Sequence, residues 1–174
     1  MKIDYNDIAL HKPVQYVSEL RWLLEKLELL QPRKTAVEIG VFKGGTFYAF
    51  MKLFDEVIGI DIEKQDFTFP LRDNDQYIIG DSKDVNIIGQ VEEGIDFLFI
   101  DGDHTYRGVC DDFYLWKSKV RKGGIIALHD IKGVDYGGRI GTEVQSFWNE
   151  IKPAYNTEEV IHHDKFFGIG LIRV

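Results

Sequence analysis

Short apolar runs alternate with segments of helical periodicity along this chain. Five of these runs are apolar at nearly every position, which is typical of strands that are buried on both faces of a parallel sheet. They span residues 36–39, 57–60, 77–79, 95–100 and 125–128. Such strands, alternating with helices, predict an α/β fold in which the sheet carries helices on both faces.

Helical periodicity begins near the start of the chain. Pro13 is expected at the first position of a helix that extends to residue 30 and packs on the core beside the functional site. Its apolar residues at helical spacing are Val17, Leu20, Leu24 and Leu27. Further helices are predicted at residues 47–54, 83–90, 106–120 and 144–151.

The last part of the chain has a different pattern. Two further strands are predicted at 158–161 and 167–172, and about four residues between them are too few for a crossover helix. We therefore expect an antiparallel hairpin that closes a Rossmann-like, mostly parallel sheet of seven strands. The length of 174 residues predicts a single domain, 1–174, on which the helical segment 1–30 packs.

Composition narrows the range of partners. The net charge of −8 and the pI near 5.1 argue against nucleic acid, because proteins that bind it concentrate Lys and Arg on one face. No apolar run is long enough to cross a bilayer, and the first residues lack the apolar core of a secretory signal. The single cysteine, Cys110, fits a reducing compartment. These features favour a cytoplasmic protein that binds neither nucleic acid nor membrane.

The segment TAVEIGVFKGGT, residues 35–46, is the most informative part of the sequence. It predicts a strand that breaks at Gly40 into a glycine turn before a helix, and such a turn lets backbone amides close on a small ligand. A dinucleotide fingerprint needs a second glycine where this chain has Phe42. The turn therefore favours a nucleoside without a diphosphate over NAD, and the Glu38 carboxylate suits a cationic amino group.

Polar residues follow each of the next strands, and the carboxyl ends of parallel strands meet at one edge of a sheet. Asp61 lies 21 residues after Gly40, a spacing at which a carboxylate can accept ribose hydroxyls, although it could equally cap a helix. Asp81 and Ser82 could hold an adenine amino group or cap the following helix. Their joint occurrence favours a nucleoside site.

Longer motifs carry a family resemblance. They are VEIGVFKGGT, GID, GDS, FLFIDGDHTYRGVCDDF and GGIIALHD, each at the end of a predicted strand. With them the chain resembles class I S-adenosylmethionine-dependent methyltransferases from about residue 14 to its end. More narrowly it resembles the small group with an IDGDHTY signature, related to macrocin-type sugar and antibiotic O-methyltransferases.

The resemblance implies S-adenosylmethionine as the cofactor and a hydroxyl of a small molecule, a sugar or a phenolic metabolite, as the acceptor. It places Asp61 at the ribose and Asp101 near the sulfonium and amino groups. The cofactor-binding residues that it implies are Glu38, Gly40, Gly44, Gly45, Thr46, Asp61, Asp81, Ser82 and Asp101.

The resemblance also raises the question of a divalent metal, Mg or Mn. Metal-dependent relatives hold a cation with carboxylates at the ends of the fourth and fifth strands, which here are Asp101 and Asp130. Where those relatives have a second acidic residue, this chain has His129, so a site built only from oxygen lacks one ligand. The alternative is that Asp130 braces the following loop.

Methyl transfer to a hydroxyl also needs an acceptor that can lose its proton. A metal could lower the hydroxyl's pKa, or a histidine could act as base. His104 is the expected base and His129 a base or ligand. Tyr106 and Arg107 could border the acceptor, although a tyrosine that starts an apolar stripe is more often core, and the glycine-rich segment 132–141 is a candidate lid.

Several alternatives stay open at this point. Methylation of nitrogen needs less help with deprotonation, and a nucleoside-binding domain without turnover would also use the glycine turn. The NAD enzyme ranks third because of Phe42. A homodimer in which a second copy completes the acceptor pocket is compatible with the sequence.

Overall fold

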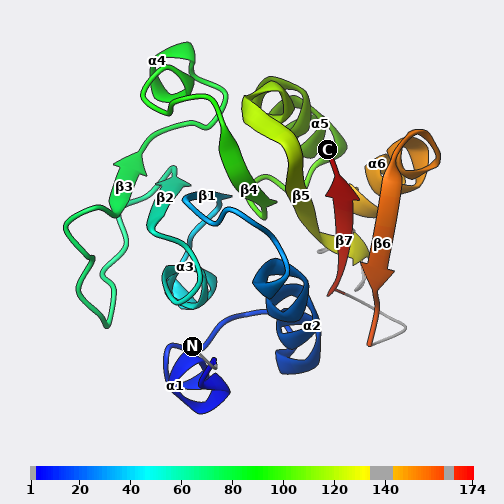
Figure 1. The fold of residues 1–174 in the computed structure, drawn as a ribbon. Helices are drawn as coiled ribbons and strands as arrows, with labels where there is room; N and C mark the ends of the chain where they lie inside the picture. Colours follow the sequence, from blue (N-terminus) through cyan, green and yellow to red (C-terminus); the bar gives the residue numbers. More distant parts are fainter. Residues whose placement is uncertain (1–2, 134–142, 163–166) are drawn as a thin grey trace.

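The computed structural model describes residues 3–133, 143–162 and 167–174 (Figure 1). Within these ranges a sheet of seven strands has the order β3-β2-β1-β4-β5-β7-β6. The strands are β1 Thr35–Ile39, β2 Glu56–Asp61, β3 Gln76–Ile79, β4 Ile95–Ile100, β5 Val120–Lys132, β6 Asn156–Val160 and β7 Phe167–Arg173. The helices are α1 Tyr5–Leu10, α2 Val17–Glu28, α3 Gly45–Met51, α4 Val85–Ile88, α5 Tyr106–Trp116 and α6 Val144–Ile151, with 3₁₀ turns η1 Lys117–Lys119 and η2 Lys152–Ala154.

Strand pairing follows the predicted topology. The strands from β3 to β5 pair in parallel, whereas β7 pairs antiparallel with both β5 and β6. The chain starts at β1, proceeds outward to β3 and then returns to β4 on the other side of β1. The predicted Rossmann-like sheet with a closing hairpin is therefore confirmed, and its strand order reverses between β1 and β4.

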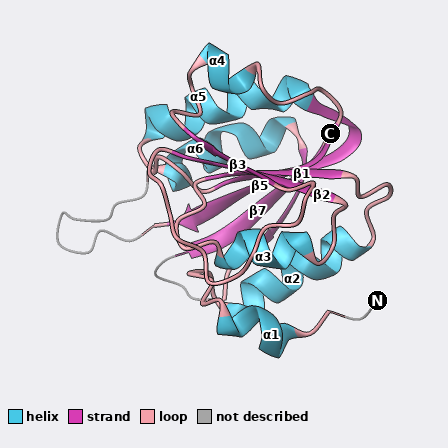
Figure 2. Ribbon diagram, turned by 90° about the vertical axis from the view of Figure 1, so that its left-hand side faces the viewer, coloured by secondary structure: helices cyan, strands magenta, loops and turns pink. Residues whose placement is uncertain are grey.

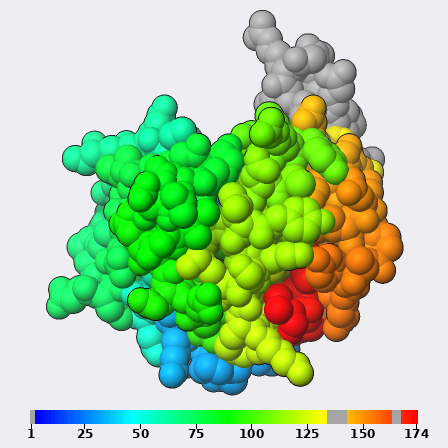
Figure 3. Space-filling model, turned by 90° about the horizontal axis from the view of Figure 1, so that it is seen from above, coloured from blue at the N-terminus to red at the C-terminus, as the bar shows by residue number. Residues whose placement is uncertain are grey.

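Helices cover both faces of the sheet (Figure 2). The first three, α1 to α3, lie on one face, and α4 to α6 lie on the other. Figure 3 shows the second of these faces, where the segments from α4 to α6 form a continuous surface beside the C-terminal residues. None of the helices in the described ranges is both long and apolar enough to cross a bilayer.

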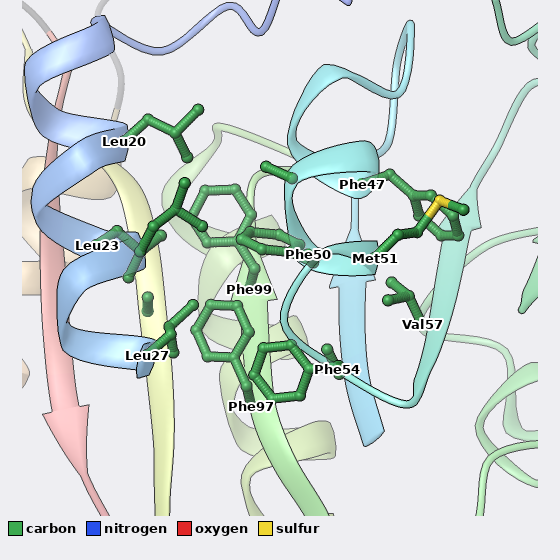
Figure 4. Close-up of a cluster of buried hydrophobic side chains, with 14 of the residues drawn as sticks. Leu20, Leu23, Leu27, Phe47, Phe50, Met51, Phe54, Val57, Phe97 and Phe99 are labelled. Carbon is green, nitrogen blue, oxygen red and sulfur yellow. The ribbon is translucent and has the colours of Figure 1, made fainter. Parts of the chain in front are cut away.

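A large apolar core lies between the sheet and the first three helices (Figure 4). Leucines of α2 and phenylalanines of α3 meet the side chains that β4 directs to this face. The labelled members are Leu20, Leu23, Leu27, Phe47, Phe50, Met51, Phe54, Val57, Phe97 and Phe99. The helical spacing of the α2 leucines thus fixes which side of the helix faces the sheet.

The opposite face has its own core. It brings the stripe of α5 together with α6, and its bulky members Phe113, Trp116, Phe147 and Trp148 are fully buried. Because successive residues of β4 alternate between the two cores, the whole strand is buried, as its apolar run predicts.

The N-terminal prediction needs correction. Pro13 does not start a helix, since α2 begins at Val17 and a separate helix, α1, precedes it. Asp4 caps α1 by accepting from the amide nitrogens of Asn6 and Asp7. The residues around Pro13 form an irregular segment that crosses the start of α3, where a Cβ on Gly45 would lie 2.5 Å from Pro13 Cα.

Two further elements differ from the prediction. Strand β3 is half-exposed, not buried on both faces, because it lies at the edge of the sheet and is covered lightly. Strand β5 extends well beyond the predicted 125–128, from Val120 to Lys132. The segment 63–75, whose sequence has no apolar period, forms no helix, and its Phe67 and Phe69 stack on Phe47 of α3.

Candidate functional site

A cavity of about 800 Å³ opens at the carboxyl ends of the parallel strands. At its floor β1 meets β4, and a Cβ on Gly40 would lie 2.2 Å from the carbonyl oxygen of Asp101. Gly40 also has a φ of +83°. The left-handed backbone and the close approach both require glycine here. The cavity thus lies where the strand order reverses, which is the usual ligand site of open α/β sheets.

Most of the residues singled out from the sequence line this cavity. Those that do are Gly40, Gly45, Thr46, Asp61, Asp81, Ser82, Asp101, His104, His129 and Asp130. They come from five separate segments of the chain, which the sheet brings to one edge.

Asp61, at the end of β2, holds the glycine turn. Its Oδ2 accepts from the amide nitrogens of Val41 at 2.9 Å and Phe42 at 2.8 Å, and its Oδ1 accepts from the amide of Glu63 at 3.0 Å. The amide nitrogens of Val41 and Phe42, which could otherwise bind a pyrophosphate, therefore already donate to the Asp61 carboxylate. This geometry gives a second reason, besides the side chain of Phe42, why the turn does not suit a dinucleotide.

Glu38 is placed differently from what the sequence suggested. Its side chain is fully buried and does not line the cavity, so its carboxyl group does not face a ligand amino group. Thr46 donates a short hydrogen bond to Glu38 Oε1. Burial raises the pKa of Glu38 well above its usual value, which favours the neutral acid. The contact ties the end of β1 to the first turn of α3.

Gly44 also lies outside the cavity lining. It precedes α3 with a φ of +78°, and a Cβ there would lie 2.7 Å from the ring of Phe67. Gly44 thus shapes the turn and leaves space for the ring of Phe67, which stacks on Phe47.

The loop after β3 is clamped from the neighbouring helix. Ser82 donates from its Oγ to Asp112 Oδ1 at 2.5 Å, and Trp116 Nε1 donates to the Ser82 carbonyl oxygen at 2.9 Å. Burial raises the pKa of Asp112 to about 6. Asp81 does not cap α4, as one alternative held, because the capping residue is Asp84. Contacts from α5 therefore hold Ser82 at the cavity wall, and Asp81 lines the wall beside it.

A polar cluster occupies the ends of β4 and β5. His104 Nε2 lies 3.2 Å from Asp101 Oδ1, and its Nδ1 lies 3.3 Å from Asp130 Oδ2. His129 Nδ1 lies 3.1 Å from the same Asp101 oxygen. The ring of His129 is buried, whereas 40% of the His104 side chain is exposed. His104 is therefore the histidine that a ligand in the cavity can reach.

The electrostatics of this cluster follow from its carboxylates. The hydrogen bond to Asp101, together with the charges of Asp101 and Asp130, raises the pKa of His104 to about 9. Burial raises the pKa of Asp130. With only these protein groups around it, His104 keeps its proton at neutral pH. A role as base therefore requires that positive charge from elsewhere first offset the carboxylates.

Three side chains of this cluster could hold a metal ion. One atom each from Asp101, His104 and Asp130 lie within 4.8 Å of one another. Two carboxylate oxygens and one imidazole nitrogen make a donor set that fits a divalent cation, and the imidazole favours Mn over Mg. The structure thus adds His104 to the predicted pair of metal ligands, whereas His129 braces Asp101 from behind.

Sequence reasoning missed two residues of this site. Gln15, from the segment before α2, is buried and donates from Nε2 to Asp101 Oδ2 at 2.8 Å. Phe167, the first residue of β7, lines the cavity beside His129. Neither lies in a motif, and neither a single glutamine outside the predicted strand ends nor a phenylalanine in an apolar strand gives a sign of such a role.

Other candidates lie elsewhere. Tyr106 donates to Glu150, and Arg107 is exposed and paired with Asp111, so neither borders the cavity. The predicted lid, 132–141, lies mostly outside the described residues, although Lys132 and Gly133 line the cavity.

Comparison with known proteins places this site in a family context. A family model described as a methyltransferase domain matches residues 37–131. An uncharacterized protein of Acanthamoeba polyphaga mimivirus is 34% identical over an alignment of 134 residues, which covers 68% of this chain and 61% of that protein. The chain thus spans about three fifths of the length of this relative.

Solved structures share the fold at low sequence identity. The MycE methyltransferase of the mycinamycin biosynthetic pathway, solved with Mg, SAH and mycinamycin VI, matches with a TM-score of 0.71 at 16% identity. That match covers 99% of this chain and 54% of MycE. An O-methyltransferase from Bacillus cereus, solved with SAH, matches with a TM-score of 0.67 at 15% identity, covering 100% of this chain and 93% of that chain.

Proposed function

Because this chain belongs to the methyltransferase domain family, whose model covers residues 37–131, we propose that it transfers the methyl group of S-adenosylmethionine to a hydroxyl of a small molecule. One observation carries the proposal. The carboxylates of Asp61, Asp101 and Asp130, each from a different strand end, converge on a single cavity that also contains His104.

The cofactor side of the cavity is formed by the glycine turn and the ends of β2 and β3. Asp61 lines the cavity and fixes the turn, which supports its role at the ribose. Asp81 and Ser82 form the adjoining wall, which supports their role beside the adenine. The amides of the turn are held by a carboxylate, so this side suits a nucleoside that carries no pyrophosphate. S-adenosylmethionine fits that description, and the MycE and Bacillus cereus structures contain its demethylated product, SAH.

The acceptor side is formed by the polar cluster and the segment before α2. In the reaction the acceptor oxygen bonds to the methyl carbon while the bond from that carbon to sulfur breaks, and the hydroxyl proton leaves. The protein must therefore align the oxygen and receive its proton. His104 is accessible from the cavity and is the proposed proton acceptor, with Asp101 and His129 orienting it. Its two carboxylate neighbours favour the protonated ring, so this role depends on the positive sulfonium of the cofactor to offset their charge.

A divalent metal ion is a second way to activate the acceptor hydroxyl, and the residues of the polar cluster fit such an ion. Asp101, His104 and Asp130 would hold the ion, Mg or Mn, which would lower the pKa of a bound hydroxyl. In that arrangement His104 is a ligand, and the buried His129 serves to orient Asp101. The MycE structure contains Mg, which agrees with this assignment.

A methyl-transfer assay with S-adenosylmethionine and small hydroxyl compounds, read by product mass and fragmentation, tests the proposal. We expect a methylated oxygen in the product and strongly reduced turnover in a His104→Ala variant. Methylation at nitrogen that survives loss of both His104 and His129 would support the N-methyltransferase instead. Cofactor binding without any turnover would support a binding domain.

A further inference from the structure

Backbone strain in this protein is concentrated at the cavity. In the described part of the chain four residues other than glycine have a left-handed backbone, and every one of them lines the cavity. They are Lys12, Phe42, Asp130 and Phe167, with φ of 51°, 47°, 61° and 70°. A bulky side chain rarely adopts this conformation, and where it persists the surrounding structure holds it in place for a function.

For Phe167, the structure shows which contacts stabilise the left-handed backbone. The next residue, Gly168, is also left-handed with a φ of 79°, and its amide nitrogen donates to Glu19 Oε2 at 3.2 Å. The amide nitrogen of His162 donates to Glu19 Oε1 at 2.9 Å. Glu19 is a fully buried residue of α2. One buried carboxylate thus accepts hydrogen bonds from residues on both sides of the connection between β6 and β7. These bonds stabilise the left-handed backbone at Phe167 and Gly168.

The ring of Phe167 forms a wall of the acceptor side. Its centroid lies 5.3 Å from that of His129, with 31° between the planes, and 5.0 Å from that of Tyr16, which meets it edge-on at 73°. His129 in turn contacts Asp101. The Phe167 ring therefore packs against Tyr16 and His129 and lines the cavity beside the polar cluster.

The parts of the chain that build this wall lie outside the family model. Tyr16, Glu19 and Phe167 fall before and after residues 37–131, whereas Asp61, Asp101 and Asp130 fall inside. Residues that carry the shared reaction are expected within the shared region. Residues at the two ends of the chain are available to recognise what differs between relatives, which is the acceptor.

We propose that Phe167 determines acceptor specificity by stacking against the apolar face of a ring that carries the reacting hydroxyl, and that Glu19 is the positioning residue that holds Phe167 in place. This inference rests on the proposed methyltransferase function and names its substrate class. A ring with an apolar face and polar edges matches a cavity in which an aromatic wall adjoins carboxylates and imidazoles. The C–H face of a sugar and the π face of a phenol share this chemistry.

Ligand-observed NMR on the full chain saturated with SAH tests the inference without knowledge of the natural acceptor. The probes are catechol, methyl β-D-glucopyranoside and, as an open-chain control, glycerol. We expect at least one ring probe to bind and glycerol not to compete with it. Phe167→Leu should weaken that binding about tenfold, while SAH affinity changes less than about threefold. Tyr114→Leu, an exposed aromatic of α5, is the matched control and should change neither.

The probes also separate the two kinds of ring that share an apolar face. Binding of catechol alone indicates a phenolic acceptor, and binding of the glycoside alone indicates a sugar. Failure of both ring probes to bind, equal binding by glycerol, or an unchanged affinity in Phe167→Leu would overturn the inference and leave the proposed function intact. Failure of SAH to bind the wild-type chain would end both.

Glu19→Gln tests the positioning role. The amide keeps the size of the side chain but directs an N–H group toward one of the two backbone amides, so the left-handed backbone at Phe167 and Gly168 should shift. We expect the ring-proton resonances of His129, which lie in the ring current of Phe167, to move, and the ring probe to bind more weakly while SAH binds as before. Unchanged His129 resonances together with unchanged probe binding would contradict this role. If the variant does not fold, Phe167→Leu decides alone.

Discussion

Gln15 Nε2 lies 2.8 Å from Asp101 Oδ2, a contact that spans 86 residues of the chain. The other oxygen of Asp101 contacts His104 and His129. Both oxygens of this partly buried carboxylate are therefore engaged, and its orientation depends on the segment before α2. The N-terminal part of the chain thus completes a site whose carboxylates and histidines lie within residues 37–131, the part that matches the methyltransferase domain.

Gln15→Leu should weaken SAH binding. The substitution keeps the approximate size of the side chain but leaves Asp101 Oδ2 without its donor, which costs about 1–2 kcal/mol, or about tenfold in affinity. Calorimetric titration measures this difference. Gln90→Leu replaces an exposed glutamine after α4 and should bind SAH as the wild type does. Equal affinities for the two variants would show that Gln15 does not order Asp101.

Glu38→Gln should have little effect on cofactor binding. Burial raises the pKa of Glu38 well above its usual value, which favours the neutral acid, and the amide imitates that form. We expect SAH affinity within about threefold of wild type, since no charge is lost. Glu38→Ala is the companion variant, which removes the contact to Thr46 and should lower the melting temperature. A large loss of affinity in Glu38→Gln would instead show that a charged Glu38 attracts the ligand.

The sequence predicted the fold well because its signals are local. Apolar runs of β1, β2 and β4 and the stripe of α5 each reflect burial that every residue in the run experiences. The predictions were wrong where a distant segment decides the outcome. Pro13 stays outside a helix because it crosses Gly45, and β3 is exposed because nothing pairs with its outer edge in the described sheet.

The site was predicted in part for the same reason. Strand ends carry Asp61, Asp101 and Asp130, and parallel topology alone brings them to one cavity. The direction in which Glu38 points depends on Thr46, and the contribution of Gln15 depends on how the N-terminal segment folds back. No pattern in the sequence encodes these tertiary contacts.

Asp112→Asn should stabilise the protein at neutral pH. Burial raises the pKa of Asp112 to about 6, above its value in the unfolded chain. An acid with a raised folded-state pKa contributes stability below its unfolded pKa and loses it as the pH rises through the folded value. The asparagine removes this dependence while it can still accept from Ser82.

The advantage of Asp112→Asn over wild type should therefore grow by about 2 kcal/mol between about pH 4.5 and about pH 7. Urea unfolding at the two pH values measures it. Asp111→Asn, an exposed neighbour on α5, serves as the control and should show no such trend. An advantage that stays constant with pH would mean that Asp112 is not the titrating group.

A divalent cation should bind the polar cluster. We expect electron paramagnetic resonance to detect bound Mn²⁺ in the wild type, and His104→Ala and Asp130→Ala each to weaken binding at least about tenfold, because each removes one of three ligands. Asp111→Ala should bind Mn²⁺ normally. Removal of the metal with a chelator should abolish methyl transfer and leave SAH binding unchanged. Full activity in the chelator would favour His104 as base.

Calorimetric titration of SAH into the wild type, Asp61→Ala and Asp130→Ala tests the account most directly. The wild type should bind SAH and not NAD. Asp61→Ala should weaken binding by about a hundredfold, because it removes both a ribose partner and the acceptor for two turn amides, while Asp130→Ala changes it by less than about threefold. No affinity of the wild type for SAH, or equal affinities of the two variants, would contradict the central claim that these strand ends form an adenosyl-binding cavity.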